Sequence, residues 1–302
     1  MTENLDPETD LALTKAATLV EALPWIRRFR GEIIVVKFGG NAMVRPELTR
    51  SFAEDMVFLR SVGVLPVVVH GGGPQISAAL DDAGIASDFR GGYRYTSPEA
   101  MSVVRSVLVD GVNRGLVAEI DAQGGWGTTL SGAEGGLFRG RKRTALVDGV
   151  EQDLGQVGDV VRVRAEVVRQ ALRDGRIPVV SSVAVDEVEE TALLNVNADA
   201  AAAALAEALG AAKLMILTDV QGLYADWPRR DSLIDSISAD ALRELIPQLE
   251  SGMIPKMSAC LQAVDGGVAK SAIIDGRMPH SVLLEIFTTS GIGTEVTPEE
   301  KP

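Results

Sequence analysis

The run Val67-Val68-Val69-His70-Gly71-Gly72-Gly73-Pro74 decides how this chain folds. Its β-branched residues are typical of a buried strand, and the three glycines let the backbone turn sharply and expose bare N–H groups beyond the strand. Such a turn either binds an anion or only reverses the chain. A second stretch, Ile33-Ile34-Val35-Val36-Lys37-Phe38-Gly39-Gly40, adds a lysine at the strand end. Two such junctions in one sheet predict one anion site.

The remaining elements alternate between strands and helices. A helix over 75–83 starts directly behind the glycines, so the positive end of its dipole points at the turn. Further helices are expected at 11–23, 48–61, 98–120, 163–174, 198–209 and 258–266. Further strands are expected at 177–185, 213–217, 272–274 and 282–287, with a β-hairpin or two at the sheet edge within 123–159. This alternation predicts an α/β fold with a mostly parallel sheet covered by helices.

The composition excludes several classes of protein. A chain of 302 residues that is 46% hydrophobic can bury a large core, and its net charge of −13 argues against a nucleic-acid or anionic-membrane partner. Cys260 is the only cysteine, and His70 and His280 are the only histidines, which excludes an internal disulfide and a zinc cluster. No apolar run is long enough to cross a bilayer, and the acidic N-terminus does not resemble a secretory signal. We therefore expect a cytoplasmic protein.

An N-terminal segment precedes the first strand. Residues 1–10 are acidic and are predicted to be disordered. From Leu11 on, apolar residues recur at helical spacing, and Pro24 is expected to kink or end this helix before Trp25. The apolar stripe of the helix packs either on its own subunit or against another subunit.

Three charged side chains have two interpretations each. Arg94 lies among turn-forming residues and is either a surface charge or a bidentate clamp for a substrate carboxylate. Asp199 falls in the first turn of a helix, where it either only stabilises the helix N-terminus or takes part in a site. Lys256 precedes a helix, either as surface decoration or in a loop that Gly252 and Pro255 hold in one shape.

The motif inventory points to phosphoryl transfer. The chain has no Gly-Lys dipeptide, and hence no Walker lysine, and no dinucleotide fingerprint follows the first strand. No histidine lies near a suitable serine or Cys260, which excludes the usual nucleophile schemes. What remains are the glycine turns, two lysines, an aspartate, an arginine and the loop 218–224 at a strand's carboxyl end, where open α/β sheets bind ligands. These groups suit the positioning and neutralising of a moving phosphoryl group.

Five motifs occur in the order that is typical of one family. They are 36–43 (VKFGGNAM), 70–74 (HGGGP), 92–96 (GYRYT), 195–199 (NVNAD) and 252–256 (GMIPK). With these motifs the chain, over nearly all of residues 31–294, resembles the N-acetylglutamate kinases of the amino-acid kinase family. The glycine turns and the loop at 218–219 are shared more widely in that family, whereas the 92–96 and 195–199 motifs together point to the acetylglutamate members.

The resemblance implies a three-layer α/β/α sandwich with a mostly parallel open sheet. It implies an N-terminal extension (1–30) for oligomerisation and regulation, an N-terminal lobe (31–190) for acetylglutamate binding and dimerisation, and a C-terminal lobe (191–302) for ATP and arginine. The implied activity is ATP-dependent phosphorylation of the side-chain carboxylate of N-acetyl-L-glutamate, in arginine biosynthesis. That carboxylate is ionised near neutral pH, so no general base is needed.

The resemblance also implies roles for single residues. Lys37 and Lys256 would flank the transferred phosphoryl group, Asp199 would orient both lysines, and N–H groups of the glycine turns would add donors. The implied catalytic set is Lys37, Lys256, Asp199 and Gly40. The implied substrate-binding set, with Arg94 on the α-carboxylate, is Gly72, Gly73, Arg94, Asn195 and Asn197. The implied nucleotide-binding set is Thr218, Asp219, Gly222, Tyr224 and Lys256. Mg²⁺ would be carried mainly by the ATP phosphates and water, without a protein metal site.

A further set of residues resembles the arginine-inhibited subgroup of these kinases. In that subgroup, N-terminal helices interlace between dimers to build a hexamer, a trimer of dimers. The residues that match the arginine site are Lys213, His280, Glu285, Gly291 and Trp25. Glu285 would pair with the guanidinium of L-arginine. Trp25 departs from the tyrosine that is frequent in the subgroup, which puts any contact of that hydroxyl in doubt.

Two alternatives stay open at this point. Another carboxylate-directed amino-acid kinase, for glutamate or aspartate, would carry the same glycine turns. A non-catalytic arginine sensor would bind arginine without turnover, and the presence of Lys37, Asp199 and Lys256 together argues against it.

Overall fold

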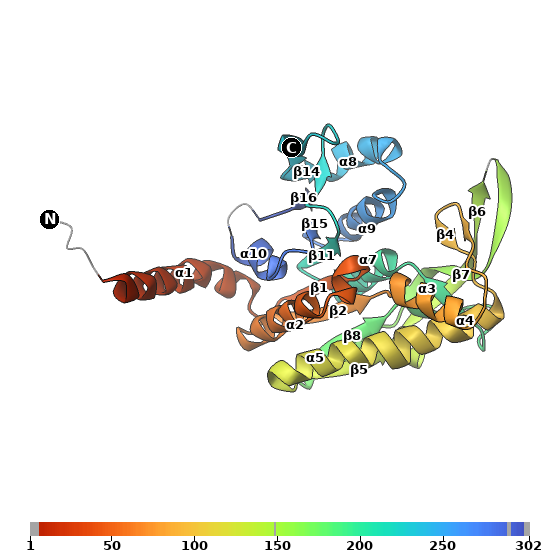
Figure 1. The fold of residues 1–302 in the computed structure, drawn as a ribbon, viewed down its shortest axis with the longest axis horizontal. Helices are drawn as coiled ribbons and strands as arrows, with labels where there is room; N and C mark the ends of the chain where they lie inside the picture. Colours follow the sequence, from red (N-terminus) through yellow and green to blue (C-terminus); the bar gives the residue numbers. More distant parts are fainter. Residues whose placement is uncertain (1–5, 148, 289–290, 299–302) are drawn as a thin grey trace.

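The fold is built on one eight-stranded sheet (Figure 1). The computed structural model describes residues 6–147, 149–288 and 291–298. The strand order is β14-β16-β15-β11-β1-β2-β8-β5, and only β15 and β16 are antiparallel neighbours. The strands are β1 (Ile33–Phe38), β2 (Leu65–His70), β5 (Gly127–Ser131), β8 (Ile177–Ser181), β11 (Lys213–Thr218), β14 (Ser236–Ser238), β15 (Lys270–Asp275) and β16 (Thr294–Thr297). The predicted α/β fold with a mostly parallel sheet is confirmed.

Helices cover both faces of this sheet. Alternate residues of a strand point to opposite faces, and consecutive residues of β1 are buried, so both faces are covered. Val35 of β1 belongs to a core cluster with side chains of α6, α7, α8 and α9. Its neighbours Ile34 and Val36 belong to a second cluster with side chains of α2, α5 and α10. The helices are α2 (Pro46–Ser61), α3 (Gly73–Asp82), α6 (Glu166–Arg173), α7 (Ala198–Leu209), α8 (Ala239–Leu245), α9 (Ile254–Asp265) and α10 (Ser281–Phe287). The arrangement is a three-layer α/β/α sandwich.

The helix expected over 98–120 is longer and contains a π-helical turn. It runs from Pro98 to Gly124 as α4 (Pro98–Arg105), the π segment η2 (Ser106–Asn113) and α5 (Arg114–Gly124). The short 3₁₀ turns are η1 (Gly40–Val44), η3 (Glu134–Gly136), η4 (Arg230–Ser232) and η5 (Ile246–Gln248). In the described ranges, no helix is both long enough and apolar enough to cross a membrane.

A second β unit, a closed barrel of four strands, stands beside the main sheet. It consists of β6 (Phe138–Val147), β7 (Val150–Val163), β9 (Val183–Asp186) and β10 (Leu193–Val196). The hairpin expected within 123–159 is β6–β7, but its expected place at the sheet edge is wrong, because it belongs to the barrel. The strand expected over 177–185 divides at Ser182 into β8 and β9. A continuous apolar run fits a buried strand of either sheet, so hydrophobicity alone does not reveal that the chain passes from the main sheet to the barrel at Ser182.

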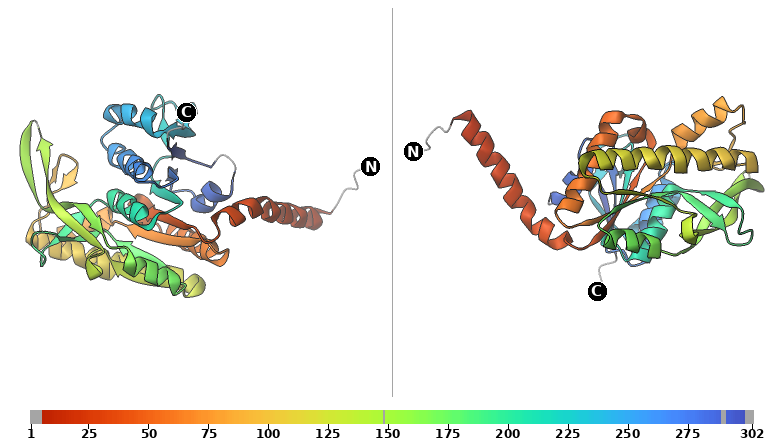
Figure 2. Two further views of the ribbon diagram at one scale, coloured as in Figure 1. Left: turned by 180° about the vertical axis from the view of Figure 1, so that it is seen from behind. Right: turned by 90° about the horizontal axis from the view of Figure 1, so that it is seen from below.

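Two small hairpins complete the β structure. One pairs β3 (Phe89–Arg90) with β4 (Tyr93–Arg94), and the other pairs β12 (Leu223–Tyr224) with β13 (Leu233–Ile234). The β3–β4 hairpin lies beside the β6–β7 hairpin in both front and back views (Figures 1 and 2).

The N-terminal helix α1 (Pro7–Phe29) extends away from the rest of the fold (Figure 1). The side chain of Asp6 caps it by accepting hydrogen bonds from the N–H groups of Glu8 and Thr9, so the predicted disorder of residues 7–10 is wrong. Residues 1–5 lie outside the described residues. Pro24 was expected to kink or end the helix, and it does not end it, because α1 continues to Phe29. Large apolar side chains of α1 are exposed, namely Leu11, Leu13, Leu19, Val20 and Leu23.

The strand predicted over 282–287 is wrong, because these residues form α10. Val282 and Ile286 are buried four residues apart and Leu284 is exposed, which is helical spacing. The neighbour of β15 on the side away from β11 is instead β16. Helix α9 begins at Ile254, so Lys256 lies in its first turn rather than in a preceding loop.

Candidate active site

A cavity of about 320 Å³ lies where β1, β2 and β10 end. Its lining includes the residues after β1 and β2, the first turn of α7 and the first turn of α9. The expected catalytic and substrate-binding residues all line it: Lys37, Gly40, Gly72, Gly73, Arg94, Asn195, Asn197, Asp199 and Lys256. The structure therefore brings together in one cavity two sets of residues that come from both halves of the sequence.

Two lysines share one carboxylate in this cavity. Nζ of Lys37 lies 2.9 Å from Oδ1 of Asp199, and Nζ of Lys256 lies 3.1 Å from Oδ2. Lys37 comes from β1, Asp199 from α7 and Lys256 from α9. Lys37 and Asp199 are buried, so water screens their charges only weakly. The three side chains carry a net positive charge at the end of the cavity where two glycine turns meet.

The environment of Asp199 keeps it ionised. Burial by itself would raise the pKa of Asp199, but the charges of Lys37 and Lys256 more than offset this and hold the pKa below its usual value. Asp199 is not the helix cap. The side chain of Asn197 caps α7 by accepting hydrogen bonds from the N–H groups of Asp199 at 2.8 Å and Ala200 at 3.0 Å. The carboxylate of Asp199 is thus left to the two lysines.

The glycine turns are required by close packing and by backbone conformation. A Cβ on Gly72 would lie 2.8 Å from Cδ2 of Leu108, in the π-helical segment. Gly40 has φ +71°, which L side chains rarely adopt. A Cβ on Gly73 would meet nothing within 4 Å, so this residue faces open space in the cavity. Helix α3 starts at Gly73, which points its unpaired N–H groups toward the cavity.

His70 contacts the start of the glycine turn, and its ring is neutral near pH 7. It is fully buried, and this burial lowers its pKa to about 4. Nδ1 of His70 lies 2.9 Å from the carbonyl oxygen of Gly71, and Nε2 lies 3.0 Å from Nδ2 of Asn113. These contacts place the donor hydrogen on Nδ1 and leave Nε2 to accept from Asn113. The neutral ring holds the start of the glycine turn.

Arg94 is a buried cation whose protein partners are neutral. Its Nη2 donates to Oγ of Ser77 at 2.7 Å, and its Nη1 donates to Oγ of Ser87. Within the described residues, no carboxylate lies at ion-pair distance from it. The carboxylate of Asp81 acts on Arg94 only from a distance. A buried guanidinium without a contacting carboxylate favours an anionic ligand, and the cavity is where such a ligand would lie. This placement favours the clamp over the surface-charge interpretation.

Four of the five expected nucleotide-binding residues lie at the carboxyl end of β11 or just after it, whereas Lys256 lies on α9. Thr218 ends that strand, and Oδ2 of Asp219 accepts a hydrogen bond of 2.8 Å from Nδ2 of Asn41. Gly222 and Tyr224 line a separate cavity of about 380 Å³, where the ring of Tyr224 lies 5.2 Å from that of Trp227. Asp219 lies close to the cavity that holds Lys37, because a Cβ on Gly40, which lines that cavity, would lie 3.5 Å from the carboxylate oxygens of Asp219.

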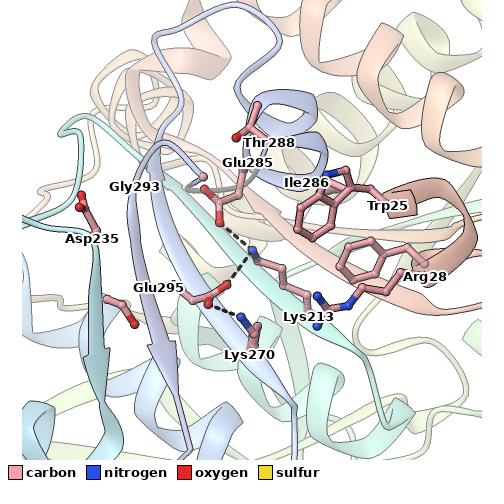
Figure 3. Close-up of a pocket in the computed structure, with 13 residues that line it drawn as sticks. Trp25, Arg28, Lys213, Asp235, Lys270, Glu285, Ile286, Thr288, Gly293 and Glu295 are labelled. Atoms are coloured by element: carbon pink, nitrogen blue, oxygen red, sulfur yellow. Dashed lines mark hydrogen bonds and ion pairs between the residues drawn. The ribbon is translucent and has the colours of Figure 1, made fainter. Parts of the chain in front are cut away.

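Another cavity, of about 280 Å³, lies between the end of α1 and the sheet (Figure 3). Four of the residues expected at an arginine site line it, namely Trp25, Lys213, Glu285 and Gly291. Nζ of Lys213 lies 2.6 Å from Oε1 of Glu285 and 3.3 Å from Oε2 of Glu295. Gly291 has φ +65°, which L side chains rarely adopt, and a Cβ there would lie 2.5 Å from Oε2 of Glu285.

His280 lies outside this cavity. It precedes α10 with φ 56°, and its Nδ1 lies 2.7 Å from Oδ1 of the buried Asp55 on α2. Its backbone N–H donates to Oγ of Ser51 at 2.8 Å. Backbone N–H groups of Val282 and Leu283 also contribute to the environment of Asp55. His280 thus ties the start of α10 to α2.

Asp55 should make the stability of the protein depend on pH. Burial raises its pKa from 3.8 to about 6, against the lowering effect of His280. A raised pKa in the folded state contributes stability that is present below pH 3.8 and is lost as the pH rises through 6. The free energy of unfolding of the wild type, measured relative to Asp55→Asn by urea titration, should therefore fall by up to about 3 kcal/mol between pH 4 and pH 7. A difference that stays constant over this range would contradict the assignment.

Several cavity residues were not expected from the sequence. Phe89, Leu108 and Ser182 line the cavity. Ser77 and Ser87 accept hydrogen bonds from Arg94, and Asn41 donates a hydrogen bond to Asp219. Asn41 lies within the 36–43 motif, next to Gly40, and Phe89 lies three residues before the 92–96 motif, so proximity in sequence is an available signal for both. Small serines carry no comparable signal, because they occur throughout loops and helix starts.

Comparison with known proteins identifies the family of this chain. Residues 32–275 match the model of the amino acid kinase family. The acetylglutamate kinase of Leifsonia xyli subsp. xyli is 65% identical over 291 residues, which covers 96% of each chain. The acetylglutamate kinase of Bifidobacterium adolescentis is 59% identical over 298 residues, which covers 98% of this chain and 94% of that protein.

Solved structures of lower identity share the fold. The N-acetylglutamate synthase from Neisseria gonorrhoeae, complexed with coenzyme A and N-acetyl-glutamate, is 24% identical with a TM-score of 0.81, covering 95% of this chain and 64% of that one. The carbamate kinase from Giardia lamblia bound to AMP-PNP is 16% identical with a TM-score of 0.59, covering 89% and 99%. At such identities the likeness shows the fold alone. From the match over 32–275 and the close curated relatives, the chain belongs to the amino acid kinase family.

Proposed function

We propose that the protein transfers the γ-phosphoryl group of ATP to the side-chain carboxylate of N-acetyl-L-glutamate, forming N-acetyl-L-glutamyl 5-phosphate in arginine biosynthesis. The observation that carries this proposal is the buried arrangement of Lys37 and Lys256 on Asp199, between two glycine turns. The names and identities of the curated relatives support the choice of acceptor.

The lysine pair accounts for the transfer step. The moving phosphoryl group carries negative charge on its oxygens, and two ammonium groups held by one carboxylate can neutralise it without reorganising. The acceptor carboxylate is already ionised, so no general base is needed. This agrees with a histidine, His70, that is neutral and turned toward Gly71 and Asn113.

The other end of the cavity suits the rest of the acceptor. Arg94 would pair with the α-carboxylate, and its serine partners leave part of its guanidinium for that ligand. Asn195 and the N–H groups around Gly72 and Gly73 would bind the acetamido group. The side-chain oxygen of Asn197 is used in capping α7, so its contribution to the site is to hold Asp199 in place.

The nucleotide would lie along the carboxyl end of β11, with its base toward the cavity of Tyr224 and Gly222. Mg²⁺ on the ATP phosphates would neutralise part of their charge and keep most of its waters. Among the described residues, no group of three or more His, Cys, Asp or Glu side chains is placed to hold a metal ion. Asp219 fits a supporting role, because its Oδ1 is buried without a hydrogen-bond partner in the described part of the chain.

Acceptor specificity is the test of this proposal. Purified protein with ATP and Mg²⁺ should release ADP with N-acetylglutamate and much more slowly with glutamate or aspartate. Equal or faster turnover of an unacetylated acceptor would favour another carboxylate-directed kinase. Arginine binding by calorimetry without turnover of any acceptor would favour a sensor.

We further propose that L-arginine inhibits the enzyme by binding in the cavity at the end of α1. The carboxylates of Glu285 and Glu295 suit a guanidinium, and Lys213 and Lys270 suit the α-carboxylate of arginine (Figure 3). In this proposal residues 1–30 form an extension for oligomerisation and for regulation of the enzyme. Residues 31–190 bind the acceptor and form the dimer, and residues 191–302 bind ATP and arginine. A cytoplasmic location, where ATP is available, is part of the same proposal.

The apolar stripe of α1 would assemble dimers into a hexamer. Leu13 and Val20 are 53% and 69% exposed and lie on one side of the helix, whereas Thr18 lies on the opposite side. Leu13→Asp with Val20→Asp should leave dimers in light scattering and weaken arginine inhibition, because the same helix carries Trp25 to the cavity. Thr18→Asp is the control and should change neither property. A hexamer that survives the double substitution would contradict the interlacing of α1.

A further inference from the structure

The two faces of the β3–β4 hairpin contact different parts of the molecule. Phe89 pairs with Arg94 across the hairpin and Arg90 pairs with Tyr93, so each pair shares one face. Phe89 and Arg94 line the acceptor cavity, with the guanidinium of Arg94 4.7 Å from the Phe89 ring. Arg90 and Tyr93 face the β6–β7 hairpin. The position of Arg94 in the cavity therefore depends on how the opposite face is seated.

The β3–β4 hairpin packs against an irregular part of the β6–β7 hairpin. Lys142 pairs with Gly158 but Thr144 pairs with Asp153, so β7 contains extra residues opposite Arg143. Nη1 of Arg90 donates to the carbonyl oxygen of Asp153 at 2.8 Å. The turn of the small hairpin is equally close, because a Cβ on Gly91 would lie 2.9 Å from Cβ of Ala145.

Arg143 joins the two hairpins. Its guanidinium carbon lies 4.1 Å from the centre of the Tyr93 ring, and its Nη1 lies 2.6 Å from Oδ1 of Asp159 on β7. Tyr93 packs against the small core cluster of Ala145, Leu154 and Val157. The ion pair with Asp159 thus fixes the guanidinium of Arg143 over the Tyr93 ring. There a cation–π contact can hold the β3–β4 hairpin against β6–β7.

We propose that Arg143 is a positioning residue for the acceptor: by its contact with Tyr93 it holds the β3–β4 hairpin against β6–β7 and so sets Arg94 and Phe89 in the cavity. The inference rests on the proposed function for the identity of the acceptor. Loss of the contact lowers the fraction of molecules whose hairpin is seated, and the apparent affinity for the acceptor falls by the same factor.

Steady-state kinetics with matched variants test this proposal. Arg143→Ala should raise KM for N-acetylglutamate about two- to fivefold, the value of one partly exposed cation–π contact, and leave kcat and KM for ATP unchanged. Tyr93→Leu should do the same, and the double variant should add little to either single change. Arg143→Lys and Tyr93→Phe should retain most of the wild-type KM. Arg141→Ala is the control, because Arg141 lies on the same strand but pairs with Glu187.

Amide hydrogen exchange without substrate separates this proposal from the proposed function. The peptide covering 87–96 should exchange faster in Arg143→Ala and Tyr93→Leu than in wild type, and at the wild-type rate in Arg141→Ala. Unchanged exchange in Arg143→Ala would overturn the proposal, as would faster exchange with an unchanged KM. If wild type did not turn over N-acetylglutamate, the proposed function would fail, and the exchange comparison alone would decide whether Arg143 seats the hairpin.

Discussion

Replacing Lys37 or Lys256 with alanine should lower kcat by about two to three orders of magnitude. Each ammonium group is held by the buried Asp199, so each presents a fixed charge where the phosphoryl oxygens become most negative. KM for N-acetylglutamate should change far less, because the interaction is made chiefly in the transition state. The measurement is steady-state ADP release for each variant.

Controls for this prediction come from the same chain. Lys142→Ala removes an exposed lysine far in sequence from both motifs and should leave kcat unchanged. A wild-type kcat in either Lys37→Ala or Lys256→Ala would remove that lysine from the transfer step. A large rise in KM at constant kcat would instead assign it to substrate binding.

Asp199→Asn should have the largest effect on stability, lowering the free energy of unfolding by about 3 to 5 kcal/mol at neutral pH. Asp199 is 3% exposed and Lys37 is 7% exposed, so the substitution leaves a buried ammonium group without its counter-charge. Because the pKa of Asp199 is lowered in the folded state, this contribution is present above the ordinary pKa of 3.8 and is lost as the pH falls through the folded value. Urea titration at pH 7 measures the difference.

A second substitution separates the loss of pairing from simple misfolding. Lys37→Met in the Asp199→Asn background removes the uncompensated charge and should recover part of the lost stability, so that the two effects are not additive. Additive losses of unfolding free energy would mean that Asp199 and Lys37 contribute to stability independently of each other. Activity should be lost in the single and the double variant alike.

The elements that position the site could be predicted because their signals are local. The β-branched run before Gly71 and the run before Gly39 identify two buried strands and two turns without any knowledge of the rest of the chain. Asp199 and Lys256 remained ambiguous because their roles depend on each other, across 57 residues of sequence. The contact between Asn41 and Asp219 spans 178 residues and has no local signal at all.

The incorrect predictions have physical reasons as well. The apolar residues 282–287 suit a strand as well as a short buried helix, and only their partners on α2 and β15 decide between the two. Pro24 was expected to kink or end α1, and it does not end it, because the helix continues to Phe29. The role of His280 at the arginine site, which the resemblance implies, stays a prediction: its ring contacts Asp55, and it is not among the residues that line the cavity.

The most direct test of the central claim is the product formed from N-acetylglutamate. An acyl phosphate reacts with hydroxylamine to give a hydroxamate, so the ratio of hydroxamate to ADP reports where the phosphoryl group goes. We expect one hydroxamate for each ADP with N-acetylglutamate as acceptor, and neither product from Lys37→Ala on the same time scale. ADP release without hydroxamate, or no turnover at all by the wild-type protein, would contradict the account.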